Sequence, residues 1–297
     1  MIVRILGSAA GGGVPQWNCH CRVCAEARNG SGRAAPRTQS SVAVRADDGP
    51  WFLLNASPDL RQQLAEFPVE PTSDLRAAPF AGVVLTDAEI DHTAGLLLMR
   101  ESNSPLNVYS TEAVRRALTE HYPVLRVLER YCGVRWTKIE PGEPIGLGDG
   151  LQVDVFPTGG GPPLYVDEPV PDLTAIGLTI RDRATGGVFT YAPALHEIDD
   201  GVFGRLKASD YAAVDGTFWT NDELVELGLA ERNALAMGHV PLSGPNGSLQ
   251  LLQDISTRTI LVHVNNTNPV LLDDSPERAL VSESGIAVGY DGMEIRL

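Results

Sequence analysis

Basic side chains are scarce in this chain of 297 residues, which carries 23 lysines and arginines against 38 acidic residues and has a formal net charge of −15. Proteins that bind nucleic acids need a basic surface to meet the phosphates, and anionic membranes attract basic segments in the same way. The deficit therefore argues against both partners. Hydrophobic and charged residues make up 43% and 21%, which is ordinary for a globular protein. A protein that acts on a small molecule or a peptide fits this composition.

Long apolar runs are also missing. No stretch approaches the roughly 18 apolar residues that a membrane-spanning helix needs. The first six residues alternate like a strand, and they lack the apolar core and the cleavage site of a signal peptide. We find no internal repeat, low-complexity tract or linker. We therefore expect a single domain over residues 1–297, and a cytoplasmic protein without membrane insertion.

Cysteine is rare, but three of the four cysteines form one C-x-C-x-x-C array, Cys19, Cys21 and Cys24. In a reducing compartment such clustering favours a metal site over disulfides. Three thiolates this close can occupy three corners of a tetrahedral zinc site. A redox role is less consistent with the array, because thioredoxin-like motifs open a helix within a different strand pattern. The spacing predicts a structural zinc loop at residues 15–30.

Acidic side chains crowd one turn, Thr86–Gly95, between an apolar strand at residues 82–85 and the first turns of a helix at residues 96–100. The turn contains three carboxylates and one imidazole: Asp87, Glu89, Asp91 and His92. Carboxylates this close repel one another at neutral pH unless a cation neutralises them. A divalent metal explains the cluster, and a solvated acidic turn is the alternative on this segment alone.

Two further polar residues stand at the ends of apolar strands. Asp215 follows the strand at residues 211–214, and His263 follows the strand at residues 259–262. Residues at strand ends on one edge of a layered α/β fold converge in space. Together with Asp91 and His92 of the acidic turn, they supply two carboxylates and two imidazoles, a mixed site suited to Fe(II), Zn(II) or Mn(II). Taken singly, Asp215 is explained by a simple turn and His263 by a packed side chain. The prediction of a metal site therefore depends on the fact that three strands each end in a metal-capable residue.

Apolar and alternating stretches predict an α/β fold. The predicted strands lie at residues 1–6, 41–45, 51–54, 82–85, 106–109, 135–139, 151–156, 175–181, 188–191, 211–214, 259–262 and 293–296. One helix is predicted to start with Ser57 as N-cap and Pro58 in its first position. A second, at residues 111–131, is interrupted by Pro123, and a third starts near residues 221–223. The segment at residues 157–171, rich in proline and glycine, is predicted to be a long loop.

The acidic turn resembles the T-H-x-H-x-D-H-x-x-G signature of the metallo-β-lactamase superfamily, with Asp87 and Glu89 in place of the first two histidines. The resemblance implies an αββα sandwich, in which two mixed sheets are flanked by helices. In that superfamily the two histidines and a third one downstream hold one metal, and this chain has no histidine at residues 157–161, where the third is expected. What remains matches the other metal position: Asp91, His92, Asp215 and His263. A two-metal hydrolytic mechanism is therefore in doubt.

Four segments narrow the resemblance to the family of B proteins of pyrroloquinoline quinone (PQQ) biosynthesis: residues 7–13, 15–19, 86–92 and 263–269. The resemblance covers nearly the whole chain. It implies an iron-dependent hydroxylase that uses O₂ to add hydroxyl groups to the tyrosine ring of a glutamate–tyrosine precursor. A soluble carrier of the quinone or its precursor to the periplasm and a one-metal hydrolase are the alternatives. Other PQQ-biosynthesis proteins and a homodimer stay open as partners.

The resemblance also implies roles for the residues of the active site. Asp91, His92 and His263 would hold Fe(II) as a mononuclear site. Asp215 would be a fourth ligand or would hold the iron's water. His239 would handle protons or bind the substrate phenol, by analogy with a histidine that sits near the metals in the tRNA-processing nucleases of the superfamily.

Supporting roles follow from the same resemblance. Asp87 and Glu89 would accept hydrogen bonds that orient the metal ligands, and the glycines at residues 11–13 would border the pocket. Related phosphodiesterases carry the same zinc array, with a fourth ligand three residues after the last metal histidine. That position is Asn266 in this chain, so Asn266, His20 or a water molecule is the predicted fourth zinc partner.

Overall fold

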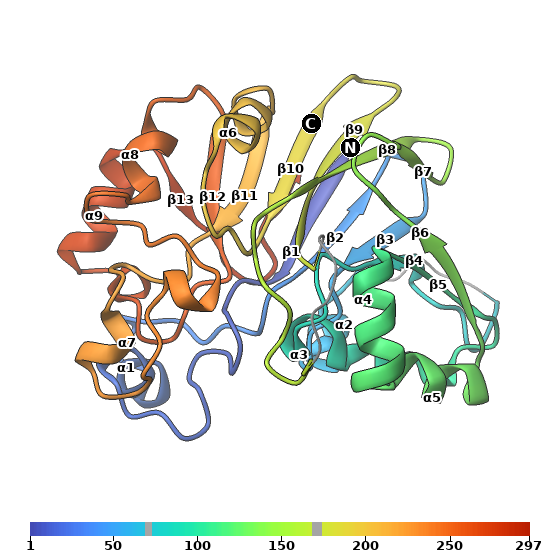
Figure 1. Ribbon diagram of the computed structural model, residues 1–297, viewed down its shortest axis with the longest axis horizontal. Coiled ribbons are helices and arrows are strands. Elements are labelled where there is room, and N and C mark those ends of the chain that lie inside the picture. Colours follow the sequence, from blue (N-terminus) through green and yellow to red (C-terminus); the bar gives the residue numbers. More distant parts are fainter. Residues whose placement is uncertain (69–72, 168–173) are drawn as a thin grey trace.

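The computed structural model describes residues 1–68, 73–167 and 174–297, so part of the predicted loop at residues 157–171 lies outside the described residues. The described strands form two sheets of seven strands each, packed face to face (Figure 1). The first sheet has the order β14 (Glu294–Arg296), β1 (Ile2–Gly7), β2 (Ser41–Arg45), β3 (Trp51–Leu54), β4 (Phe80–Val84), β5 (Leu106–Ser110) and β6 (Val134–Lys138). The second has the order β13 (Ala287–Val288), β12 (Arg258–Val262), β11 (Tyr211–Asp215), β10 (Val188–Ala192), β9 (Ile176–Asp182), β8 (Leu151–Pro157) and β7 (Ile145–Leu147).

Helices lie outside the two sheets, as the two sides of Figure 1 show. Those beside the first sheet are α2 (Leu60–Ala65), α3 (Ile90–Thr93), η1 (Ala94–Glu101), α4 (Glu112–Arg116), η2 (Ala117–His121) and α5 (Val124–Tyr131). Those beside the second are α1 (Arg22–Asn29), α6 (Asp200–Lys207), α7 (Glu223–Glu226), η3 (Leu235–Met237), α8 (Ser248–Gln253), η4 (Pro269–Leu271) and α9 (Pro276–Glu283). Among the described helices, none combines the length and the apolarity needed to span a bilayer. The arrangement confirms the predicted αββα sandwich.

The core lies in three apolar layers, one between the sheets and one on the outer face of each. Ile5, Leu54 and Phe189 are fully buried in the layer between the sheets. Strands covered on both faces are apolar throughout rather than alternating, and the four residues of β3 are all buried. Both sheets are mixed. In the first, antiparallel β1, β2 and β3 continue into parallel β4 and β5, and in the second, β10 pairs antiparallel with β9 and parallel with β11.

Two local predictions need correction. The helix expected from Ser57 begins at Leu60, with Asp59 as its N-cap, and the Ser57 hydroxyl donates instead to Gln63 Oε1 at 3.1 Å. The helix expected at residues 96–100 is preceded by α3, which starts at Ile90. Asp91 and His92 therefore lie in the first turn of a helix, while Asp87 and Glu89 precede it.

Pro123 divides the predicted helix at residues 111–131, as expected, because proline offers no amide hydrogen to the preceding turn. The segment folds as α4, η2 and α5, with the break directly before Val124. The hairpin predicted between residues 175–181 and 188–191 is present, and β9 and β10 pair antiparallel.

Candidate metal centre

Three polar segments meet at one end of the two sheets. α3 follows β4, Asp215 ends β11, and His263 comes directly after β12. β11 and β12 pair in parallel with Asp215 opposite Val262, so His263 lies one residue beyond this pair. The backbone of His263 has a φ of 56°, a left-handed conformation that residues other than glycine rarely adopt. Such strained residues concentrate at functional sites.

His92 is held from one side of its ring. Its Nδ1 atom lies 2.8 and 2.7 Å from the two carboxylate oxygens of Asp87, so Nδ1 carries the proton and donates it to that carboxylate. Asp87 also accepts hydrogen bonds from the Thr86 hydroxyl and the Glu89 amide. Asn55 holds the Thr86 amide and hydroxyl in turn. This chain of hydrogen bonds sets the tautomer and the direction of the His92 ring.

The other ring nitrogen of His92 is buried and has no hydrogen-bond partner among the described residues. A buried polar atom without a partner costs free energy, so it calls for an explanation. Asp91 Oδ2 lies 3.9 Å from His92 Nε2 and 3.1 Å from His263 Nε2. The candidate ligand atoms of Asp91, His92 and His263 all lie within 4.8 Å of one another. One carboxylate and two imidazoles fit a divalent cation, and they match the donor set of non-haem Fe(II) sites.

Asp215 and His239 form a pair beside this triad, and their candidate ligand atoms lie within 4.8 Å of each other and of His263. His239 Nδ1 lies 2.7 Å from Asp215 Oδ2, which also accepts a hydrogen bond from the Leu195 amide. Asp215 Oδ1 accepts from the amide and the hydroxyl of Thr217. Each carboxylate oxygen thus receives two hydrogen bonds, which is its usual capacity. In this arrangement Asp215 orients His239, and a metal ion could bind Asp215 only if it released a partner.

Thr217 was not among the predicted site residues. Its hydroxyl oxygen lies 2.9 Å from His263 Nδ1 and 3.1 Å from His239 Nδ1. The contact with His263 Nδ1 leaves Nε2 of that ring to face Asp91. The turn Asp215-Gly216-Thr217 is visible in the sequence, but the pairing of β11 with β12 is what brings Thr217 to both histidines.

The carboxylates shift the pKa values around them. Burial opposes the charged form of His92, but Asp87 and Asp91 raise its pKa from 6.5 to about 9. Burial also opposes ionisation of Asp87 and Asp91, yet His92 holds the pKa of each carboxyl below its ordinary value. Burial, together with repulsion from Asp87 and Asp91, raises the pKa of Glu89 from 4.5 to about 7. A protonated imidazole thus balances the cluster, and a bound metal ion would take over that role.

A cavity of about 310 Å³ opens onto both groups of residues. Gly11 borders it, as predicted, and a side chain there would meet Asp91 Oδ2 at 3.3 Å. Gly12 and Gly13, also predicted to border it, line a separate cavity. The Glu89 side chain faces the metal cavity, and its contacts with neighbouring groups come from its backbone amide and carbonyl.

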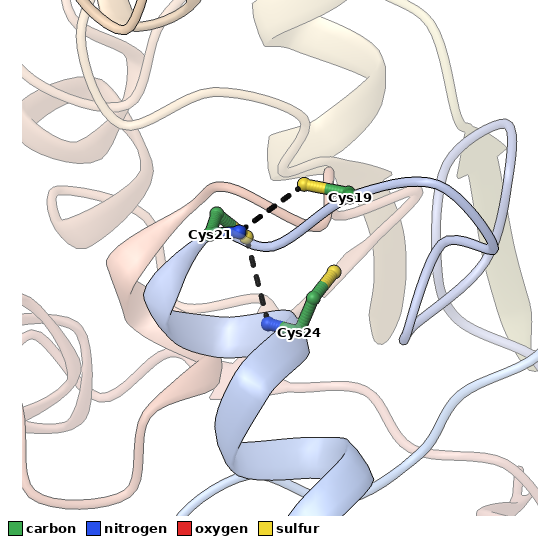
Figure 2. A group of neighbouring side chains, drawn as sticks. All are labelled: Cys19, Cys21 and Cys24. Carbon is green, nitrogen blue, oxygen red and sulfur yellow. Dashed lines mark hydrogen bonds between the residues drawn. The ribbon is translucent and has the colours of Figure 1, made fainter.

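The three cysteines come together at the start of α1 (Figure 2). Their sulfur atoms all lie within 4.8 Å of one another. Cys19 Sγ accepts a hydrogen bond from the Cys21 amide at 3.4 Å, and Cys21 Sγ accepts one from the Cys24 amide at 3.5 Å. Burial raises the pKa of the Cys21 thiol to about 12. Zinc binds thiolates and releases their protons, so this compact sulfur cluster fits a zinc ion.

Asn266 lies against the thiols. Its Nδ2 atom is 3.3 Å from Cys24 Sγ and 3.7 Å from Cys21 Sγ, and its backbone carbonyl accepts from Cys21 Sγ at 3.2 Å. The side chain of His20 is exposed and lies outside the group of candidate ligand atoms. Of the two predicted side chains, Asn266 is the one that contacts the sulfur cluster.

Comparisons with known proteins agree with this geometry. The sequence model of the β-lactamase superfamily domain matches residues 50–264. The protein named coenzyme PQQ synthesis protein B from Cupriavidus necator is 46% identical over 303 residues, which cover 99% of each chain. The protein of the same name from Azoarcus sp. is 45% identical over 305 residues, which cover 100% of each chain.

Solved structures show the same relationship. Zn²⁺-bound PqqB from Methylobacterium extorquens has a TM-score of 0.92 and 38% identity, and the alignment covers 100% of both chains. A diphosphatase of the PhnP family has a TM-score of 0.70 at 21% identity over 99% of this chain and 96% of its own, so it shares the fold. The chain therefore belongs to the coenzyme PQQ synthesis protein B family, within the β-lactamase superfamily.

Proposed function

We propose that this chain carries out a mononuclear, iron-dependent hydroxylation of the tyrosine ring of a Glu–Tyr precursor during PQQ biosynthesis, with O₂ as co-substrate. The observation that carries the proposal is the buried, unpartnered Nε2 of His92 beside Asp91 and His263. Zn²⁺ is the ion named for the related PqqB structure. We assign iron to this chain because zinc has no redox chemistry, whereas two imidazoles and one carboxylate suit Fe(II) and leave positions open.

The role of Asp87 supports a single metal rather than two. Both of its oxygens are within 2.8 Å of His92 Nδ1, and one also accepts from the Thr86 hydroxyl. A carboxylate with these partners orients a metal ligand, so it replaces the superfamily's histidine without replacing its function. Hydrolytic members use a second metal ion to activate water. Asp87 is engaged with His92, so it does not support a second metal ion here.

Each hydroxylation consumes one O₂, two protons and two electrons from an external reductant, and it yields one new C–O bond and one water. Iron held by Asp91, His92 and His263 would supply the electron transfer to O₂. The other residues hold the substrate and move protons. His239 lines the cavity, and because its Nδ1 bonds to Asp215, Nε2 is the atom left to exchange a proton with the phenol.

The cavity also offers an aromatic surface to a tyrosine ring. Phe218 lines it and packs edge-on against His239, with 5.9 Å between the ring centroids. His239 stacks on His263 with 5.2 Å between centroids. Edge-to-face and offset contacts of this kind hold a third ring in a defined orientation. Met237 and Leu164 add further apolar surface to the wall.

The test is reconstitution of the apoprotein with Fe(II) under anaerobic conditions, addition of a Glu–Tyr dipeptide and of a chemical reductant such as ascorbate to supply the two electrons, and admission of ¹⁸O₂. We expect a peptide mass gain that corresponds to ¹⁸O, and its loss in the His92→Ala variant. Absence of labelled product from protein with confirmed iron would refute the proposal. Turnover of a generic phosphodiester would support a one-metal hydrolase instead, and tight quinone binding without chemistry would support a carrier.

A further inference from the structure

Arg232 is the one arginine or lysine among the described residues that line the metal cavity. It lies in the segment between α7 and η3, on the N-terminal side of the predicted proton-handling residue His239. The other charged groups of the lining are the carboxylates Asp87, Glu89 and Asp91, and the imidazolium of His92 or a bound metal ion balances them. Among the described lining residues, Arg232 is therefore the one that brings a guanidinium to an anionic molecule in the cavity.

The guanidinium has donors to spare. One of its nitrogens, Nη2, donates to the backbone carbonyl of Ala236, which anchors the side chain to the cavity wall. A guanidinium carries five N–H donors in a planar fork, so most of them are left over. Within the described residues, no carboxylate forms an ion pair with Arg232. The side chain is exposed, so the remaining donors are accessible to a ligand.

We propose that Arg232 binds a carboxylate of the substrate and thereby turns the aromatic ring toward Asp91, His92 and His263. That the ring is a tyrosine ring rests on the proposed function. The carboxylate subsite is inferred from the residues that line the cavity. Arginine binds carboxylates in a bidentate, planar geometry that fixes orientation as well as position. Because Asp87 and Asp91 are engaged with His92 and His263, Arg232 offers its free donors to the anionic end of a ligand, and the neutral aromatic end is left to the rest of the cavity.

The apolar lining supports this division of the cavity. Phe218 and Met237 belong to the same lining as Arg232, and neither offers a partner to a charged group. A tyrosine ring loses little by contact with them, while a carboxylate placed there would be desolvated without compensation. The anionic end is therefore expected at Arg232, and substrates that lack a free carboxylate are expected to bind weakly.

The inference is tested by binding rather than by turnover, with Zn(II)-loaded protein and isothermal titration calorimetry. The probes are the dipeptide Glu–Tyr and its analogue Gln–Tyr-amide, which lacks both carboxylates and keeps the α-amino group. Loss of one charge-assisted hydrogen-bonded pair corresponds to about a tenfold change in dissociation constant or more. We expect Arg232→Gln to weaken Glu–Tyr binding at least about tenfold, to leave the amide within about twofold, and to be partly rescued by Arg232→Lys.

Arg130→Gln is the matched control, since this exposed arginine lies on α5, beside the other sheet, and its replacement changes the net charge equally. It should leave both dissociation constants unchanged. Equal weakening of the two peptides by Arg232→Gln, no weakening of Glu–Tyr, or failure of the wild-type protein to prefer Glu–Tyr would each overturn the inference. These outcomes are independent of O₂ and iron, so they are separate from the success or failure of the hydroxylation test.

Discussion

Replacing Asp87 by asparagine tests the hydrogen bond that orients His92 toward the metal position. Asparagine keeps the shape of the side chain, but it removes the charge and leaves one acceptor oxygen where the two carboxylate oxygens lie 2.8 and 2.7 Å from His92 Nδ1. A hydrogen bond to a charged group contributes about 1.5–3 kcal/mol. Loss of such a partner of a metal-bound histidine typically costs 10- to 100-fold in metal affinity, and about 1.4 kcal/mol is tenfold.

We therefore expect the dissociation constant for Fe(II) to rise by about 10- to 100-fold in Asp87→Asn. The assay is anaerobic titration of the apoprotein in competition with a chromophoric chelator, with circular dichroism to verify the fold. Glu89→Gln is the control, because Glu89 lies in the same turn and its contacts with Asp87 come from its backbone. Its pKa of about 7 also means that the carboxylate is partly protonated near neutral pH.

The control variant should change the dissociation constant by less than about threefold, because the Glu89 carboxylate is partly protonated near neutral pH and, within the described part of the chain, makes no hydrogen bond to His92. The reasoning would be refuted by an Asp87→Asn protein that binds Fe(II) as tightly as the wild type. It would also be refuted by equal losses in the two variants, because a general loss of negative charge would then explain the effect without the hydrogen bond.

Three further predictions concern pH, the second imidazole and the zinc loop. Because the pKa of His92 rises from 6.5 to about 9 on folding, its contribution to apoprotein stability is full below pH 6.5 and is lost as the pH rises through 9, so the free energy of unfolding in urea should fall over this range; a flat profile there would contradict this. Asp215→Asn should lower the pKa of His239, which Asp215 raises against burial, and cut turnover about 10- to 100-fold. Lost Fe(II) binding in that variant would make Asp215 a ligand instead. Cys21→Ser should abolish zinc binding at the cysteine cluster and lower Tm while Fe(II) affinity at the other site stays; Cys132→Ser should change none of these.

Most strands could be predicted from the sequence because their signal is local. β2 and β3 were expected at the residues they occupy, with an Asp-Asp-Gly turn between them, since apolar runs and turn residues act over a few positions. The helices α1, α6, α8 and α9 were not predicted, nor were the short strands β7 and β13. Their burial depends on neighbours from distant parts of the chain, which a short window of sequence does not contain.

The site divides in the same way. The C-x-C-x-x-C spacing determined that three thiols would cluster, because residues two and three positions apart meet within a single turn at the start of α1. The adjacent Asp91 and His92, placed after an apolar strand, likewise indicated a metal-capable turn. The absence of histidines from residues 87 and 89 argued for one metal in place of two.

Tertiary structure alone decided the partners. Asn266 reaches the cysteines across 242 residues of sequence, and Thr217 meets His263 because β11 and β12 pair in one register. Asp215 bonds to His239, and both of its carboxylate oxygens are occupied. This arrangement likewise depends on backbone amides that only the fold brings near. Sequence determines which donors a chain carries and which lie within one turn, whereas sheet register and loop packing determine which distant donors meet and which nitrogen of His92 remains free for a metal.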